Sequence, residues 1–182
     1  MRSYDYIARK GIKNVSWGEF HEMCKNLAKK LSEIDSDLIV GIARGGLFPA
    51  TLIAGMLRKE IYPIRITRRE NDQVKFTNPR WIVDVHEGVA GKKVALVDEI
   101  SDSGETLGEV SRRLNEKGTK RVTTAVLITH SWAVPEPDFH ALMSDELVVF
   151  PWDRQILING RWILHPELTE AIKSQKEGRS KI

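Results

Sequence analysis

Hydrophobic and polar residues follow two patterns along the chain, and the first is helical. From Phe20 to Ile34, apolar residues recur every three or four positions, which is the spacing of one face of a helix. Ser16 and Glu19 come just before this stretch at the spacing of a capping box, in which the hydroxyl and the carboxylate satisfy free backbone N–H groups. We therefore predict a helix that begins after Ser16 and packs Cys24 into the core.

The second pattern consists of short apolar runs, which are typical of strands covered on both faces. Strands are predicted over residues 38–42, 61–67, 93–98, 122–128 and 147–150. The polar stretch 68–80 has no periodicity, and we interpret it as a long loop or a mobile hairpin.

Further helices are predicted after these strands. Residues 47–59 carry Pro49 in their first turn, where a missing backbone N–H is tolerated. Residues 105–117 are followed by Gly118, and residues 166–176 by Gly178, since glycine readily adopts the conformation that ends a helix. Strands that alternate with helices predict an α/β fold with a mostly parallel, twisted sheet flanked by helices.

Length, composition and charge narrow the class of protein. The chain has 182 residues, 41% of them hydrophobic, which predicts one domain over residues 1–182 with a full core. The one cysteine excludes a disulfide framework, and no apolar run reaches the roughly 18 residues of a membrane span. The net charge of only +3 leaves room for an anionic ligand but predicts no nucleic-acid partner. We expect a cytoplasmic protein without membrane association.

Residues 94–106 carry the strongest functional signal. An apolar strand runs into Asp98 and Glu99, and a small polar turn with Ser103 and Gly104 then opens the next helix. Backbone N–H groups at a helix N-terminus bind phosphate. The acidic side chains would repel that phosphate, but they accept hydrogen bonds from hydroxyls or hold a magnesium ion. The combination suits a sugar that carries a phosphate and a diol.

A second loop follows the first buried strand. Gly45 and Gly46 let the backbone approach a ligand closely, and Arg44 offers a fork of donors to a pyrophosphate. Ligands of open parallel sheets bind at the C-terminal ends of the strands, so both loops belong to the expected site.

Residues 94–106 closely resemble the phosphoribosyl-pyrophosphate signature of the type I phosphoribosyltransferases, although the family more often has two aspartates where this chain has Asp98 and Glu99. The resemblance implies that these two acids contact the ribose hydroxyls, with Mg²⁺ as the cofactor. It assigns the sugar phosphate to Asp102, Ser103, Gly104, Glu105 and Thr106. It also implies that residues 44–46 bind pyrophosphate, beside a non-proline cis peptide at Ala43–Arg44.

Most of the chain further resembles the microbial xanthine-guanine and hypoxanthine phosphoribosyltransferases, which implies the type I fold with a small hood region. In these 6-oxopurine enzymes the position of Asp102 is an aspartate that exchanges a proton with a purine nitrogen, so Asp102 is the implied catalytic residue. Asp153 matches a position that holds magnesium near pyrophosphate. The family's flexible loop corresponds to the polar segment with Arg68, Arg69 and Lys75, which are candidates to touch pyrophosphate.

The resemblance leaves the base open. The 6-oxopurine enzymes place a lysine where this chain has His130, whose imidazole can donate to an oxo group or accept from the amino group of adenine. Leu147 stands where the family stacks an aromatic ring, and Val148 would offer backbone groups to the base edge.

The resemblance implies an Mg-dependent purine phosphoribosyltransferase, with hypoxanthine, guanine or xanthine as the favoured base. Its substrates are phosphoribosyl pyrophosphate and a free purine, and it is expected to be a homo-oligomer, either a dimer or a tetramer. Two alternatives stay open: an adenine-specific enzyme, and a non-catalytic regulator of the same fold that senses phosphoribosyl pyrophosphate. The low net charge, and the lack of a helix-turn-helix pattern before Ser16, favour the enzyme. Residues 154–182 receive no role.

Overall fold

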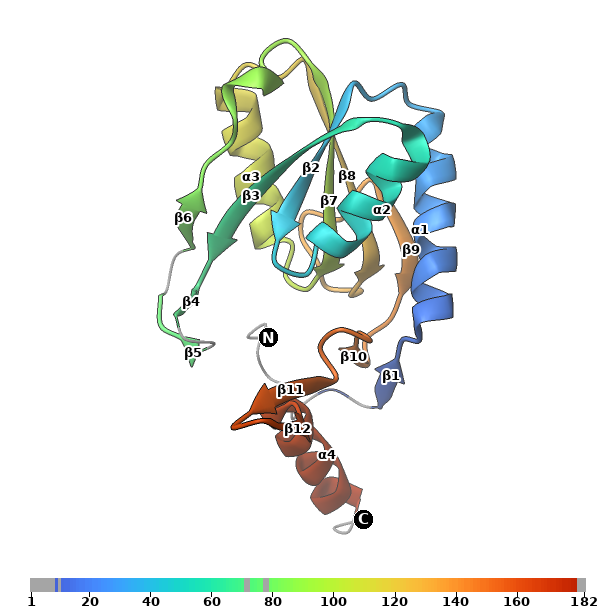
Figure 1. Ribbon diagram of the computed structural model, residues 1–182, viewed down its shortest axis with the longest axis vertical. Coiled ribbons are helices and arrows are strands. Elements are labelled where there is room, and N and C mark those ends of the chain that lie inside the picture. The colour runs from blue at the N-terminus through green and yellow to red at the C-terminus, as the bar shows by residue number, and fades with distance from the viewer. Residues whose placement is uncertain (1–8, 10, 71–72, 77–78, 180–182) are drawn as a thin grey trace. The chain divides into compact units, whose positions relative to one another are not determined.

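The computed structural model describes residues 9, 11–70, 73–76 and 79–179 (Figure 1). Its tertiary contacts group the chain into two compact units. The central unit is Glu22–Met143, and the terminal unit joins Met1–His21 with Ser144–Ile182. The expectation of one domain over the whole chain stays a prediction.

A six-stranded sheet with the order β6-β3-β2-β7-β8-β9 forms the middle of the central unit. The strands are β2 (Leu38–Ala43), β3 (Glu60–Thr67), β6 (Arg80–Val83), β7 (Lys93–Ser101), β8 (Arg121–Thr129) and β9 (Phe139–Met143). All neighbours pair in parallel except β3 and β6, which are antiparallel. The predicted α/β fold with a mostly parallel sheet is therefore confirmed.

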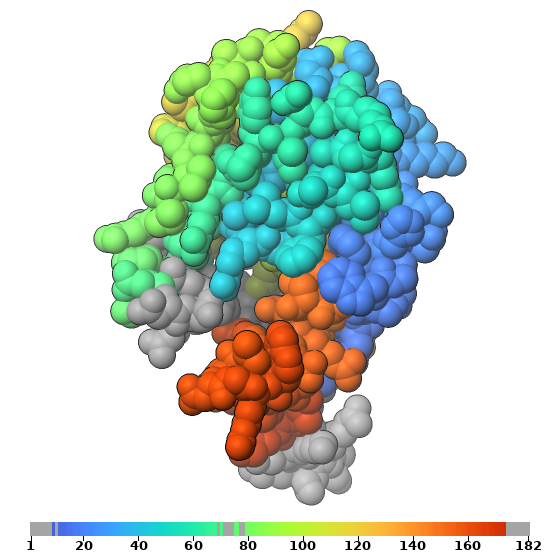
Figure 2. All heavy atoms as spheres, viewed as in Figure 1, coloured from blue at the N-terminus to red at the C-terminus, as the bar shows by residue number. Residues whose placement is uncertain are grey.

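Helices cover both faces of this sheet. Successive side chains of a strand point to opposite sides, so a strand that is apolar throughout presents a hydrophobic surface on each face. Val40 and Leu96 pack in one cluster with Leu107 and Val110 of α3 (Glu105–Glu116). The opposite face meets α2 (Leu47–Leu57), which also lies close to β3 and β7. In the space-filling view, the blue-green atoms of α2 and β3 form one continuous surface on the face that is shown (Figure 2).

Most predicted helix boundaries are confirmed. Helix α1 (Trp17–Ser32) begins with the expected capping box, since the N–H of Ser16 donates to Glu19 Oε2 at 2.8 Å and the N–H of Glu19 donates to Ser16 Oγ at 3.1 Å. Gly118 follows α3 with φ +79°, as expected of a helix stop. Gly178, in contrast, lies within α4 (Pro166–Arg179), so the prediction that it closes this helix is wrong.

The strands differ from the expected ones at two places and agree with the expectation at a third. Strand β9 was not expected, because its sequence Phe-His-Ala-Leu-Met mixes polar and apolar residues without a clear period. The strand predicted at 147–150 exists as β10 (Leu147–Val149), but it pairs with β1 (Ile12–Asn14) and not with the central sheet. The polar stretch 68–80 contains the short antiparallel pair β4 (Arg69–Glu70) and β5 (Gln73–Val74), in agreement with the hairpin interpretation.

The terminal unit has a small core. One hydrophobic cluster of this unit contains the buried residues Leu147, Val149, Leu168 and Ala171. Strands β11 (Gln155–Ile158) and β12 (Arg161–Leu164) form an antiparallel hairpin that the sequence pattern did not indicate. Within the part of the chain that the structure describes, none of the helices combines the length and the apolar character that a membrane span requires.

Candidate phosphoribosyl pyrophosphate site

The two loops that the sequence singled out meet in the central unit. Gly45 and Gly46 follow β2, and Asp98 and Glu99 lie on the neighbouring strand β7. A Cβ added at Gly45 would overlap the carboxylate of Glu99, and one added at Gly46 would overlap the carboxylate of Asp98. Glycine is therefore needed here because the acidic side chains lie directly against the loop. The expected cis peptide is also present at Ala43–Arg44.

Asp98 and Glu99 lie within β7 and not after it, so the predicted end of that strand at residue 98 is wrong. The strand continues to Ser101 because β8 pairs with it along this stretch, with Asp98 opposite Val126 and Ser101 opposite Thr129. The extension fixes both acids on a buried backbone that cannot easily shift.

The two acids differ in environment. Asp98 is buried, whereas Glu99 is half-buried. The N–H of Glu99 donates to Asp98 Oδ1 at 2.9 Å. Burial, and next the negative charge of Glu99, raise the pKa of Asp98 well above its ordinary value. A hydroxyl donor or a cation bound between these two acids would stabilise their ionised carboxylates. The pair is therefore suited to either kind of ligand.

The start of α3 provides the expected phosphate-binding turn. Gly104 precedes the helix with φ +85°, a conformation that favours glycine, and its N-cap position carries no side chain that could bond the first N–H groups of α3. The N–H of Glu105 reaches Ser103 Oγ only at 3.4 Å. The positive end of this helix therefore faces the turn of residues 101–104, which suits an anion.

Asp102 lies in this turn with a side chain that is 25% exposed. Two side chains from the loop after β8 approach the same oxygen. Trp132 Nε1 donates to Asp102 Oδ1 at 3.4 Å, and His130 Nε2 lies 3.9 Å from it. The His130 side chain has no exposed surface, so its role as a base contact stays a prediction that would require the loop to move.

The polar segment after β3 reaches the same turn. Arg68 forms an ion pair with Glu105, the first residue of α3. Lys75 pairs instead with Glu70 at 2.8 Å, and the side chain of Arg69 lies outside the described part of the structure. Contacts of these three residues with pyrophosphate stay predictions.

The other base and metal candidates belong to the terminal unit. Leu147 is buried in the small core of that unit, and Val148 is half-buried beside Lys13 of β1. Asp153 is exposed in a turn, where its N–H donates to the carbonyl of Phe150 at 3.1 Å. Their roles in binding base or metal stay predictions.

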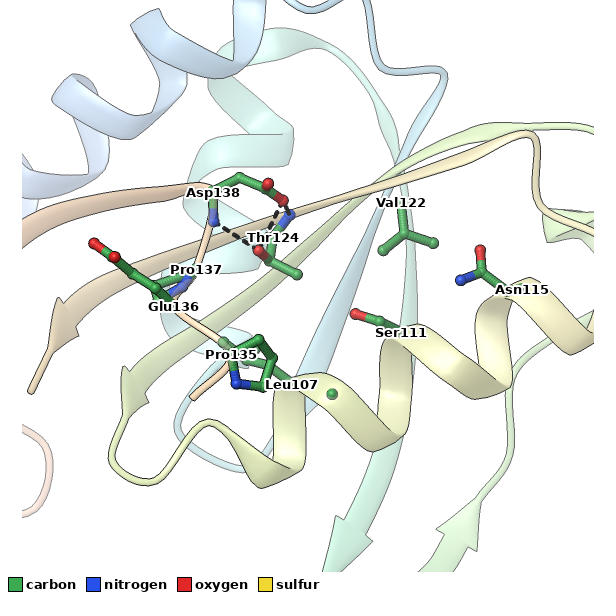
Figure 3. A pocket seen from close by; sticks show the side chains of 10 residues that line it. Leu107, Ser111, Asn115, Val122, Thr124, Pro135, Glu136, Pro137 and Asp138 are labelled. Carbon is green, nitrogen blue, oxygen red and sulfur yellow. Dashed lines mark hydrogen bonds between the residues drawn. The ribbon is translucent and has the colours of Figure 1, made fainter. Parts of the chain in front are cut away.

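A cavity of about 420 Å³ lies elsewhere in the central unit, between α3, β8 and the segment 135–138 (Figure 3). Asp138 points to Thr124 at its edge and accepts hydrogen bonds from the N–H and the hydroxyl of that residue. None of the predicted site residues lines this cavity. The predicted site residues of the central unit therefore lie away from this cavity.

A family model of the phosphoribosyl transferase domain matches residues 16–158, which is most of the chain. The chain belongs to this family. The match includes the glycine loop after β2, the acids of β7 and the turn before α3.

Known phosphoribosyltransferases and one class of regulator are similar to the chain. A purine phosphoribosyltransferase structure from Pyrococcus horikoshii superposes with a TM-score of 0.72 at 28% identity, over 81% of this chain and 98% of that one. The xanthine-guanine phosphoribosyltransferase of Idiomarina loihiensis is 26% identical over 78% of this chain and 87% of its own length. The transcriptional regulator GfcR of Methanococcoides burtonii is 32% identical over 58% of this chain. The chain spans about half of that regulator, 52% of its length.

The two acids of β7 fit a magnesium ion. Among the described residues, no group of three or more His, Cys, Asp and Glu side chains could hold a metal alone. Protein sites for Mg²⁺ commonly use one or two carboxylates and complete the shell with water and substrate phosphates. Asp98 and Glu99 provide such a pair.

The loop after β8 contributes to the site in a way that the sequence pattern did not indicate. Trp132 Nε1 donates to Asp102 Oδ1, and nothing in the local sequence pattern predicts this contact. The available signal was topological: β7 and β8 are adjacent parallel strands, so the residues after each of them meet at one edge of the sheet.

Proposed function

We propose that the protein transfers the phosphoribosyl group from phosphoribosyl pyrophosphate to a purine base, with hypoxanthine, guanine or xanthine favoured. The observation that carries this proposal is the convergence of the glycine loop, the Asp98–Glu99 pair and the Asp102 turn within one unit. The similarity to purine and xanthine-guanine enzymes supports a purine as the acceptor.

The chemistry assigned to these residues is displacement at the anomeric carbon. A purine nitrogen forms a bond to that carbon while the bond to pyrophosphate breaks, and Asp102 accepts the proton that the nitrogen loses. Asp98 and Glu99 hold the ribose diol, and the turn at the start of α3 holds the sugar phosphate. Mg²⁺, bound at Asp98 and Glu99 with the substrate, would neutralise charge on the leaving pyrophosphate.

The decisive measurement is pyrophosphate release. The protein is incubated with phosphoribosyl pyrophosphate, magnesium and, in parallel, hypoxanthine, guanine, xanthine, adenine, uracil or orotate. We expect release with at least one oxopurine, and a much slower but still measurable release in Asp102→Asn. Asp35→Asn is the matched control, because Asp35 is an exposed acid outside the site and asparagine tolerates its left-handed backbone, φ +49°. Release with adenine alone would favour the adenine-specific enzyme.

The regulator is the second candidate, because GfcR is 32% identical over 109 residues. Such a protein would bind phosphoribosyl pyrophosphate without consuming it. Binding of phosphoribosyl pyrophosphate measured by calorimetry, combined with no release of pyrophosphate with any of the six bases, would favour the regulator over the enzyme.

Three further expectations belong to this proposal. We place the protein in the cytoplasm as a homo-oligomer, dimer or tetramer, with small molecules and not nucleic acid as partners. Sedimentation at several protein concentrations measures the oligomer order directly.

A further inference from the structure

The side chains of Trp132 and His130 both lie close to one oxygen of the Asp102 carboxylate, Oδ1. Trp132 Nε1 lies 3.4 Å from Oδ1 with its N–H directed to it, and His130 Nε2 lies 3.9 Å away. A carboxylate on a short turn otherwise rotates readily about its side-chain bonds. Two contacts on one oxygen restrict that rotation.

Both side chains are themselves held in place. The rings of His130 and Trp132 stack with centroids 4.6 Å apart and an interplanar angle of 14°. His130 is fully enclosed, and Trp132 is half-buried. The stack therefore behaves as one rigid aromatic block against the Asp102 turn.

The backbone joins the two loops along their length. The N–H of His130 donates to the carbonyl of Ser101 at 3.1 Å, and the N–H of Val134 donates to the carbonyl of Ser103 at 2.8 Å. A Cβ at Gly104 would overlap the backbone of Val134, so the loops are in contact there as well. Residues 130–134 thus support residues 101–104 from one end to the other.

We propose that Trp132 and His130 are positioning residues that hold the Asp102 carboxylate in the orientation it needs toward the acceptor base. This inference rests on the proposed function, in which Asp102 accepts the proton of the base. Hydrogen bonds from a fixed donor to a carboxylate are stronger than neutral ones, and small errors in the placement of a reacting group cost large factors in rate. The buried imidazole acts through Asp102 and not on the base itself.

The first test is a pair of matched substitutions. Trp132→Phe keeps a ring for stacking on His130 but removes the indole N–H. Trp81→Phe is the control, because Trp81 Nε1 donates to Glu109 at 3.5 Å, which is the same kind of contact outside the site. We expect Trp132→Phe to lower kcat roughly 10- to 100-fold, the range for losing a supporting group, while the KM for phosphoribosyl pyrophosphate changes less than about twofold. Equal kcat values for Trp132→Phe and Trp81→Phe would overturn the proposal.

The second test separates positioning from a general loss of structure. In an Asp102→Asn background, Trp132→Phe is expected to have no further effect on the residual rate, because both substitutions interrupt one chain of contacts. His130→Phe, which keeps a buried ring but removes Nε2, is expected to behave in the same way. Effects that multiply in the double variants would mean that Trp132 and His130 act independently of Asp102.

The third test needs no turnover. The indole N–H resonance of Trp132, assigned by its loss in Trp132→Phe, is followed in the free protein by ¹H–¹⁵N NMR. Asp102→Asn should shift this resonance more than those of the other four of the 5 tryptophans. An unchanged resonance would overturn the contact, whatever the activity. If the protein turns over no base at all, the proposed function fails, and this shift alone still decides whether Trp132 holds Asp102.

Discussion

Strands β2, β7 and β8 of the central unit are buried along most of their length, whereas the β11–β12 hairpin of the terminal unit exposes its apolar side chains. The side chains of Leu157 and Trp162, which pair across the hairpin, belong to residues that are 57% and 67% exposed. A strand buried on both faces holds the residues at its end in fixed positions, and a two-stranded hairpin does not. The acids and the glycine loop of the site belong to strands of the first kind.

The largest difference between these regions should appear in core truncations. Leu127 of β8 is completely buried, so Leu127→Ala is expected to lower the free energy of unfolding by about 2–5 kcal/mol. The same change at the exposed Leu157 should cost less than about 0.5 kcal/mol. Urea denaturation followed by circular dichroism measures both variants. Equal losses would mean that the hairpin is as closely packed as the sheet.

Substitutions at Gly45 and Gly46 of the site should give the next largest effects on stability and on ligand binding. An alanine at Gly46 meets the backbone of Ile42 and Asp98, so we expect a loss of about 1–3 kcal/mol together with weaker binding of phosphoribosyl pyrophosphate. At Gly45 the nearest atoms to an added Cβ belong to the flexible end of Glu99, so Gly45→Ala should weaken binding with little loss of stability. Thermal unfolding and calorimetry separate the two results.

Gly55 supplies the control for this pair. It lies in α2 with open space around its Cβ position, so Gly55→Ala should raise stability by about 0.5–1 kcal/mol and leave binding unchanged. A stability loss at Gly45 as large as that at Gly46 would show that Glu99 cannot move aside.

The sequence predicted the structure best where buried apolar strands lead directly into the polar residues of a motif. The runs at β2, β7 and β8 are apolar because both faces are covered, and the motif residues follow them directly. The convergence of Gly45 and Gly46 with the acids of β7 could also be expected, since parallel neighbours end at one edge of the sheet.

The pairing of strands that are distant in the sequence could not be predicted in the same way. Leu147 and Val149 have the pattern of a sheet strand, but their partner is β1, at the other end of the chain. The hairpin has apolar side chains on exposed strands, so its sequence shows no alternation of buried and exposed positions. The contact between Trp132 and Asp102 depends on the path of a loop, which no local periodicity encodes.

A surface ion pair of the central unit should contribute less than its core or its glycines. Arg113 lowers the pKa of Asp84 from its ordinary value of 3.8 to about 2, mainly through a hydrogen bond. Because the folded-state pKa is the lower one, the contribution is complete above pH 3.8 and is lost as the pH falls through about 2. We expect Asp84→Asn to cost about 0.2–1 kcal/mol at neutral pH and nothing at the acid end. A loss independent of pH would assign the effect to packing.

The smallest change in the free energy of unfolding is expected for a substitution at Trp162. This substitution tests most directly whether the hairpin is open. Since this side chain is exposed, Trp162→Ser should change the free energy of unfolding by less than about 0.5 kcal/mol. Trp81→Ser, at a half-buried tryptophan packed against the main core, should cost several times more. A loss at Trp162 that matches Trp81, and that grows with protein concentration, would mean that the exposed apolar residues of the hairpin are covered in an oligomer. The contrast between a packed sheet and an open hairpin would then hold only for the isolated chain.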